Sequence, residues 1–318
     1  MRDTFVAALT EAAEADPRVM ILTGDLGFGV LTKFRDRFPQ QFINVGVAEQ
    51  NMTGLATGLA LEGRMVFTYS IANFATLRCL EHIRNDAAYH DANVKIVSVG
   101  GGFSYGALGI SHHATEDLAI LRARPAMTVV APCGLWEVRQ ATLALIRTPG
   151  TAYLRLDKSY APVDPAPGEE FALGRIRTVR QGDAITLAAT GGIMAEALVA
   201  AAELARDGIH CRVLSVSTIK PLDIATLRVA ALETGGIVTV EEHTVDGGLG
   251  GAVAEALLEG GTPPRRFYRI GLRAGFSSII GSQEYLRAAY GINASGIAAK
   301  VRVMLESTTT SAHTILNT

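Results

Sequence analysis

Short apolar runs alternate with segments of helical periodicity along most of the chain. An N-terminal helix is predicted because Phe5, Val6, Leu9 and Ala13 share one helical face. Short apolar strands that alternate with helices are typical of a parallel sheet covered on both faces. In the first half we expect strands at 18–23, 65–70, 94–99, 127–131 and 151–156, and helices at 31–37, 50–62, 75–89, 116–123 and 134–147.

A proline-rich segment divides this pattern in two. Residues 161–170 hold three prolines and break the periodicity, which indicates a linker. A second series predicts strands at 184–189, 211–216, 236–240 and 266–270, and helices at 194–207, 222–233, 250–259 and 283–290. The fold class is therefore α/β, with two domains that each have a mostly parallel sheet covered by helices. Their expected bounds are 1–160 and 175–305, with a linker at 161–174 and a disordered tail at 306–318.

Composition narrows the classes of function. The 318 residues carry a formal net charge of −2 and are 48% hydrophobic, which gives no reason to expect nucleic acid or an anionic membrane as a partner. No apolar run is long enough to cross a membrane, and residues 1–5 lack the basic start and apolar core of a secretory signal. Cys79, Cys133 and Cys211 lie far apart, so buried free thiols in a reducing, cytoplasmic setting are expected.

Glu49 is the single carboxylate in the otherwise apolar and small-residue run 42–52. The residues before it are expected to form a buried strand that ends in a glycine, and residues 50–61 have helical spacing. A carboxylate at such a junction is partly desolvated and should hold a proton readily, which suits proton sharing with a heterocyclic nitrogen. The alternative is that Glu49 only caps the helix, since acidic residues favour the first helical turn.

Three further loops have candidate chemistry. Residues 67–74 end a strand in a turn flanked by aromatic side chains, which can stack on a planar ring or pack between strand and helix. Residues 99–106 form a glycine loop without the spacing of a phosphate-binding fingerprint. His112 and His113 are adjacent and so point apart, which disfavours a shared metal ion. A histidine at the carboxyl edge of a parallel sheet suits polar contact or proton transfer.

The order of these segments resembles the C-terminal half of the transketolase family, namely its pyrimidine-binding domain followed by its C-terminal domain. The resemblance runs from about residue 2 to about residue 305. It rests on residues 44–52 around Glu49, the aromatic turn that ends in Phe74, the run Glu81-His82-Ile83-Arg84-Asn85-Asp86, the Ser111-His112 loop, and residues 241–250. Each motif alone is weakly specific, but the ordered set is specific.

The resemblance implies an enzyme that transfers a two-carbon ketol unit between sugars, and it implies roles for individual residues. Glu49 would face the N1′ atom of the aminopyrimidine of thiamine diphosphate and share a proton with it. Phe74 would stack on the pyrimidine ring, with Tyr69 near it. His112 would contact oxygen atoms of the substrate. Arg155 would grip a sugar phosphate, although an arginine on a strand is also a common ion-pair partner.

The same resemblance implies a missing half. A one-chain transketolase is roughly twice as long, and its other half carries a Gly-Asp-Gly motif that holds the diphosphate and a metal ion, Mg²⁺ or Ca²⁺. The two Gly-Asp pairs of this chain, Gly24-Asp25 and Gly182-Asp183, are followed by leucine and alanine. A separate subunit should therefore supply the diphosphate-binding domain, and α2β2 is the simplest assembly.

Three positions depart from the family pattern at the substrate end. Leu108 stands where an aspartate is usual, Gly100 where a histidine is usual, and Gly29 where a phosphate-binding serine is usual. Each lost polar contact to a charged group weakens binding by about 1.5–3 kcal/mol. An unusual sugar, nucleotide-linked or unphosphorylated, is therefore expected in place of an ordinary phosphoketose.

Other readings of the chain stay open. The beta subunit of a 2-oxo-acid dehydrogenase first component shares the two-domain layout and the glutamate, and would need a lipoyl partner. Deoxyxylulose-phosphate synthase is a third relative, usually one long chain. A non-catalytic assembly subunit would have no need of Glu49, Phe74 and His112.

Overall fold

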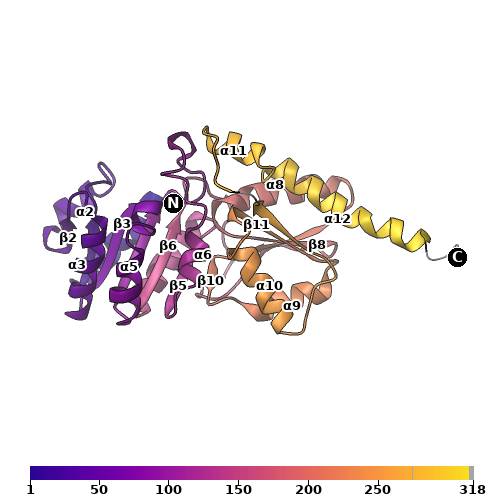
Figure 1. Cartoon of the computed structure of the whole chain (residues 1–318). Helices are drawn as coiled ribbons and strands as arrows, with labels where there is room; N and C mark the ends of the chain where they lie inside the picture. Colours follow the sequence, from indigo (N-terminus) through magenta and orange to yellow (C-terminus); the bar gives the residue numbers. More distant parts are fainter. Residues whose placement is uncertain (274, 315–318) are drawn as a thin grey trace.

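The computed structural model describes residues 1–273 and 275–314, which form two α/β domains (Figure 1). The first sheet has seven strands in the order β10-β5-β6-β4-β3-β1-β2, and all neighbours are parallel except β10 and β5. Its strands are β1 (Val19–Thr23), β2 (Phe42–Asn44), β3 (Met65–Ile71), β4 (Val94–Val99), β5 (Met127–Val130), β6 (Thr151–Leu156) and β10 (Thr218–Lys220). The predicted α/β class with mostly parallel sheets is confirmed.

Helices cover both faces of the first sheet because its central strands are apolar on both faces. One face packs on α1 and α7, and the other on α3, α6 and the segment around η2. The helical elements are α1 (Arg2–Ala15), α2 (Thr32–Arg37), η1 (Pro39–Gln41), α3 (Glu49–Leu61), α4 (Ala72–Ala75), α5 (Leu80–His82), the π-helix η2 (Ile83–Ala88), η3 (Gly106–Leu108), α6 (Asp117–Arg122) and α7 (Leu135–Arg147).

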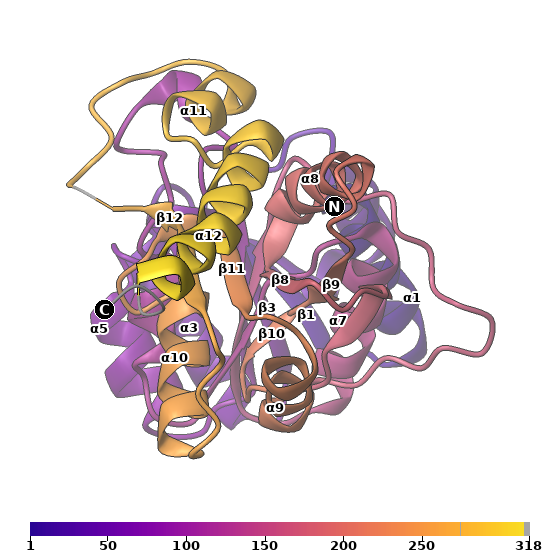
Figure 2. The ribbon, with the colours of Figure 1, turned by 90° about the vertical axis from the view of Figure 1, so that its right-hand side faces the viewer.

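The second domain has a five-stranded sheet in the order β12-β11-β8-β9-β7, parallel except for β7. In Figure 1, α8 and α12 lie above its strands, and α9 and α10 lie below them in both Figure 1 and Figure 2. Its elements are β7 (Arg177–Arg180), β8 (Ile185–Ala189), η4 (Gly191–Ile193), α8 (Met194–Arg206), β9 (Cys211–Ser215), α9 (Ile224–Glu233), β11 (Ile237–Thr244), α10 (Leu249–Glu259), β12 (Phe267–Leu272), α11 (Gln283–Ala289) and α12 (Ala294–Thr314). None of the described helices is long and apolar enough to cross a membrane.

The two short antiparallel strands escape the sequence pattern. β10 comes from the second half of the chain, yet Thr218 pairs with Val130 at the edge of the first sheet. β7 pairs with β9 at the edge of the second sheet, and both pairings contain a register shift. Strands of three or four residues with irregular register carry too little periodicity to be recognised. No helix or strand lies between β6 and β7, where the linker was expected.

Two local expectations differ from the structure. The segment 75–89, expected to be one helix, is divided into α4, a turn at 76–79, α5 and η2. The strand before Glu49, expected to be buried, is the half-buried edge strand β2, which ends at Asn44. Helix α12 continues to Thr314, and the disorder expected for the tail at 306–318 stays a prediction. Residues 315–318 of that predicted tail lie outside the described residues.

Candidate active site

Glu49 begins α3 at the carboxyl edge of the first sheet, where the loops after the parallel strands converge. Its side chain is 2% exposed. The carboxylate does not cap the helix: Oε2 accepts a hydrogen bond from Arg78 Nη1 at 2.6 Å, and Oε1 lies 3.4 Å from Ser70 Oγ. Gly24 makes room for it, since a Cβ atom there would lie 3.1 Å from Glu49 Cγ. Glu49 is therefore both the first helical residue and a buried carboxylate directed at the sheet edge.

Arg78 links this carboxylate to the Phe74 ring, which in turn contacts His112. The Arg78 guanidinium, which is paired with Glu49, sits 4.2 Å from the centre of the Phe74 ring. The His112 ring is 5.2 Å from the Phe74 ring and inclined to it by 66°. The structure thus brings together three of the residues singled out in the sequence, and one arginine that the sequence reasoning missed.

The loop that carries His112 is held by Asn73. The Asn73 amide donates to the carbonyl oxygens of His113 at 2.9 Å and Ser111 at 3.2 Å. The two adjacent histidines do point apart: His113 is buried and its Nε2 bonds Gly106 O at 3.0 Å, while His112 is half-buried among Phe74 and Tyr105. Asn73 therefore ties the loop after β4 to the turn after β3, and this connection sets the position of His112.

The environment of His112 favours a neutral ring. Burial lowers the pKa of His112, and the neighbouring His113 lowers it further. Ser111 Oγ lies 2.9 Å from His112 Nδ1, which leaves Nε2 available to a substrate. At neutral pH the ring can therefore accept or donate a single hydrogen bond without carrying a charge.

Tyr69 is not part of this group. Its ring stacks on Phe5 with centroids 6.2 Å apart, in the core beneath α1, and burial raises the pKa of its phenol well above the ordinary value. Successive residues of β3 point to opposite faces, so Ser70 reaches Glu49 while Tyr69 faces the other layer. The expectation that Tyr69 lies near Phe74 is therefore corrected. Tyr69 points to the face of the sheet that is covered by α1, and not to the face that holds Glu49.

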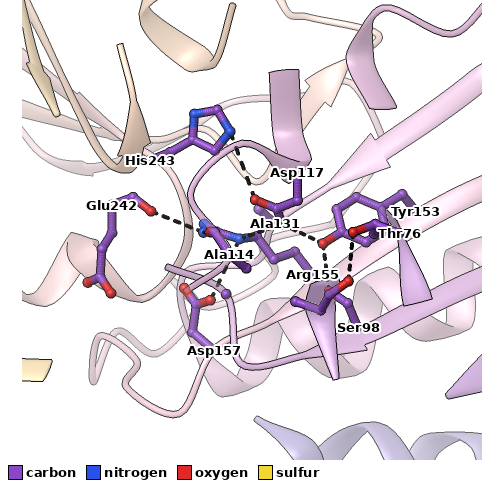
Figure 3. A network of polar contacts seen from close by, with 12 residues as sticks. Thr76, Ser98, Ala114, Asp117, Ala131, Tyr153, Arg155, Asp157, Glu242 and His243 are labelled. Carbon is purple, nitrogen blue, oxygen red and sulfur yellow. Dashed lines mark hydrogen bonds and ion pairs between the residues drawn. The ribbon is translucent and has the colours of Figure 1, made fainter. Parts of the chain in front are cut away.

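Arg155 is not free to grip a sugar phosphate. Its side chain is fully buried between the domains, where Nε lies 3.0 Å from Asp117 Oδ2 and Nη2 donates to the carbonyl oxygens of Ala114 and Glu242 at 3.0 Å (Figure 3). Burial lowers the pKa of Arg155, but attraction to the Asp117 and Asp157 carboxylates raises it by more. The pKa of Arg155 is therefore raised overall. Arg155 thus joins β6, α6 and β11, and the predicted phosphate contact is replaced by an ionic role at the domain interface.

A second buried cluster adjoins Arg155. Glu241 accepts hydrogen bonds from the amides of Leu249 and Gly250 at 2.7 and 2.8 Å and so caps α10. Burial raises the pKa of Glu241 to about 7, against the effect of these amides. Burial also lowers the pKa of His243 to about 4, against the attraction of Asp117.

These shifts predict a pH-dependent stability. Glu241 binds its proton more tightly in the folded state, so its contribution is complete below its ordinary pKa of 4.5 and is lost as the pH rises to about 7. His243 acts in the opposite direction, because stability falls as the pH drops from 6.5 to about 4. Glu241→Gln removes the glutamate titration and leaves His243 in place, although His243 Nδ1 loses a carboxylate at 3.6 Å.

The stability difference between wild type and Glu241→Gln should fall by on the order of 3 kcal/mol between about pH 5 and pH 8. Urea unfolding over this range measures it. The exposed Glu233, paired with Arg212, provides the control, and Glu233→Gln should show a small, nearly pH-independent difference from wild type. A constant difference for Glu241→Gln would contradict the prediction.

The structure shows the surroundings of Gly100, Leu108 and Gly29, the three positions that were expected to depart from the family pattern. Gly100 has φ +92°, and a Cβ atom there would lie 2.2 Å from the Tyr105 ring, so Tyr105 takes the space that a side chain at this position needs. The Lys158 ammonium group lies 3.9 Å from the centre of the same ring. Leu108 is exposed, and nothing lies within 4 Å of a Cβ atom built on Gly29. Tyr105 and Lys158 were missed because a single aromatic and a single lysine carry no pattern.

Comparisons with known proteins agree with this arrangement. Residues 1–163 match the family described as transketolase, pyrimidine binding domain, and residues 174–297 match transketolase, C-terminal domain. An apulose-4-phosphate transketolase subunit of Phocaeicola vulgatus is 39% identical over 93% of this chain and 94% of its own length. A 6-deoxy-6-sulfo-D-fructose transketolase subunit of a Clostridium species is 39% identical over 93% and 92%.

A solved structure described as a split gene transketolase, inactive beta4 tetramer, is 36% identical. It superposes with a TM-score of 0.87 over 96% of this chain and 98% of that chain. The resemblance inferred from the ordered motifs is therefore confirmed. The chain belongs to the transketolase family, to the part made of its pyrimidine-binding and C-terminal domains.

Proposed function

We propose that this chain is the pyrimidine-side subunit of a split, thiamine diphosphate-dependent enzyme that transfers a two-carbon ketol unit between sugars. The observation that carries the proposal is the buried Glu49 carboxylate beside the Phe74 ring, at the carboxyl edge of the first sheet. Relatives named as transketolase subunits support it. They favour it over the beta subunit of a 2-oxo-acid dehydrogenase, and an assembly subunit would not need this pair.

The residues present fit an aminopyrimidine. The ring needs a flat apolar surface and a carboxylate within hydrogen-bond reach of one edge. Arg78 shows that both can be met at once, since its planar guanidinium lies over Phe74 and bonds Glu49 at 2.6 Å. Thiamine diphosphate, when bound, supplies a carbon nucleophile and an electron sink. Glu49 would then hold a proton at N1′, and Phe74 would orient the ring.

His112 is proposed to contact substrate oxygens. Its half-buried, neutral ring borders Phe74, and its loop is fixed by Asn73. A neutral hydrogen bond that orients a sugar hydroxyl contributes about 0.5–1.5 kcal/mol in binding, and more where it strengthens in the transition state.

The variant His112→Ala should therefore lower kcat/KM for the sugar substrates by about tenfold, because it removes this contact. The dissociation constant of thiamine diphosphate, measured by calorimetry, should stay within about twofold, since no cofactor contact is assigned to His112. The exposed His90 provides the control. A loss confined to cofactor affinity would place His112 at the cofactor instead.

A separate subunit is proposed to complete the site. The chain has no Gly-Asp-Gly motif for the diphosphate and its Mg²⁺ or Ca²⁺ ion. The relative named as a split gene transketolase is described as an inactive beta4 tetramer, which suits a chain that needs another half. We propose an α2β2 assembly with a diphosphate-binding chain. Co-expression with a diphosphate-binding chain that carries a Gly-Asp-Gly motif, followed by native mass spectrometry, would test it, and failure of the two chains to associate would contradict it.

The substrate is proposed to be an unusual sugar. Leu108, the Gly100–Tyr105 pair and Gly29 replace groups that ordinary transketolases use for polar and phosphate contacts, and Arg155 is unavailable for them. Two assays test the substrate and the function separately. The first measures turnover of xylulose 5-phosphate with ribose 5-phosphate by the paired subunits. Efficient turnover would reject the unusual sugar. Absence of any cofactor-dependent ketol transfer, over a panel of phosphorylated, sulfonated and nucleotide-linked sugars, would reject the function.

A further inference from the structure

The Arg78 guanidinium bonds the Glu49 carboxylate and lies over the Phe74 ring. These are the two contacts that the proposed function assigns to the pyrimidine ring of the cofactor. Its Nη1 lies 2.6 Å from Glu49 Oε2, and its guanidinium carbon lies 4.2 Å from the centre of the Phe74 ring. The His112 ring is inclined by 66° to Phe74, so the guanidinium provides the stacking contact on this ring. The only other hydrogen bond given to the Glu49 carboxylate among the described residues is the 3.4 Å contact with Ser70.

A pyrimidine ring that replaces Arg78 at Glu49 and Phe74 loses part of its binding free energy, because the contacts of Arg78 must first be broken. The Arg78–Glu49 contact is a short, charge-assisted hydrogen bond to a side chain that is 2% exposed, and such bonds are about twice as strong as neutral ones. A pyrimidine that uses Glu49 Oε2 or the ring face covered by Arg78 must displace the guanidinium from that contact. The two groups therefore compete for the same positions.

Arg78 has room to move away. Its side chain is 42% exposed, and it lies in the turn at 76–79 between α4 and α5. The turn itself is anchored by buried Cys79, whose amide donates to Thr76 O at 3.1 Å, and by the Arg78 amide, which donates to Asn73 O at 3.3 Å. Rotation of the Arg78 side chain into solvent would leave this backbone and the core beneath it unchanged.

We propose that Arg78 competes with the pyrimidine ring for Glu49 and Phe74 and thereby sets the affinity for the cofactor. The inference rests on the proposed function. A binding-competent arrangement that is populated only fractionally lowers the apparent affinity by that fraction. If the paired arrangement of Arg78 dominates by about ten to one, its removal should strengthen binding by about tenfold.

The test measures the dissociation constant of thiamine diphosphate by titration calorimetry, at saturating Mg²⁺, in the complex with the diphosphate-binding subunit. Arg78→Ala should lower this constant by about threefold to thirtyfold. Arg78→Lys keeps the charge near Glu49 but loses the planar stacking surface, so its constant should fall between wild type and Arg78→Ala. It also keeps the proposal testable if the alanine variant folds poorly.

Arg18→Ala is the matched control. Arg18 also pairs with a carboxylate at 2.7 Å, that of Asp16, but it precedes β1, at the opposite edge of the sheet, and its removal should leave the constant unchanged. A constant that is unchanged or higher in Arg78→Ala overturns the competition and makes Arg78 a residue that supports Glu49. Absence of binding by the wild-type complex overturns the proposed function together with this inference.

Discussion

Replacing Glu49 with glutamine is expected to reduce turnover by the reconstituted complex by about a hundredfold to ten-thousandfold. The amide has the shape of the carboxyl group and can still contact Ser70 at the sheet edge, but it cannot hold and return a proton at N1′. Because the side chain is 2% exposed, water cannot readily take over that role. Steady-state kinetics of ketol transfer, at saturating cofactor, measure the loss.

The same variant should leave the assembly intact, because Glu49 is buried within its own domain and glutamine keeps the shape of its side chain. Native mass spectrometry of the complex checks this point. Glu81→Gln serves as the control, since Glu81 is exposed on the same segment as Phe74 and Arg78, and its activity should match wild type. Full activity of Glu49→Gln would show that the proton-sharing role is wrong.

Replacing Arg155 with methionine is expected to lower the free energy of unfolding by about 3–5 kcal/mol. Removal of the guanidinium leaves the Asp117 carboxylate buried without its cation, 3.0 Å from where Nε lay. It also removes a hydrogen bond to the carbonyl oxygen of Glu242 and one of the two to Ala114 O, which keeps the amide of Gly102 as a donor. An uncompensated buried charge is far more costly than the loss of an exposed ion pair. Urea unfolding followed by circular dichroism gives the value.

Arg139→Met is the matched control for Arg155. Arg139 pairs with Glu11 at 2.9 Å, but both side chains are about half exposed, so the change should cost less than about 1 kcal/mol. If Arg155→Met instead kept its stability and raised only KM for phosphorylated sugars, the phosphate contact first inferred from the sequence would be right and the ionic role at the interface wrong.

The sequence was sufficient for the repeating part of the fold. Strands such as β4, β6 and β8 are uniformly buried, because both faces of a parallel sheet are covered, and their apolar runs are visible without any tertiary contact. The short edge strands β7 and β10 were missed, because their pairing depends on segments distant in the chain. The break of the expected helix 75–89 was also missed, because its buried apolar residues keep helical spacing across the turn at 76–79.

Some residues of the candidate site could also be predicted from the sequence, and others could not. Glu49, Phe74 and His112 could be selected from ordered motifs, since each follows a strand at the carboxyl edge and topology alone brings such loops together. The direction of a side chain within a strand, and the partners it meets, depend on the packing of layers. Tyr69 therefore went to the core and Arg155 to the domain interface, against the expectation from their neighbours in sequence.

By itself, the sequence determined the α/β class, the two-domain division and the family, because these follow from local periodicity and from the order of motifs along one chain. Only the tertiary structure decided that Arg78 lies over Phe74 and pairs with Glu49, and that Arg155 is fixed between Asp117 and the carbonyl oxygen of Glu242. The Arg78–Glu49 and Arg155–Glu242 contacts join residues that are 29 and 87 positions apart. They depend on which face each side chain takes in the folded layers, and no local pattern records that choice.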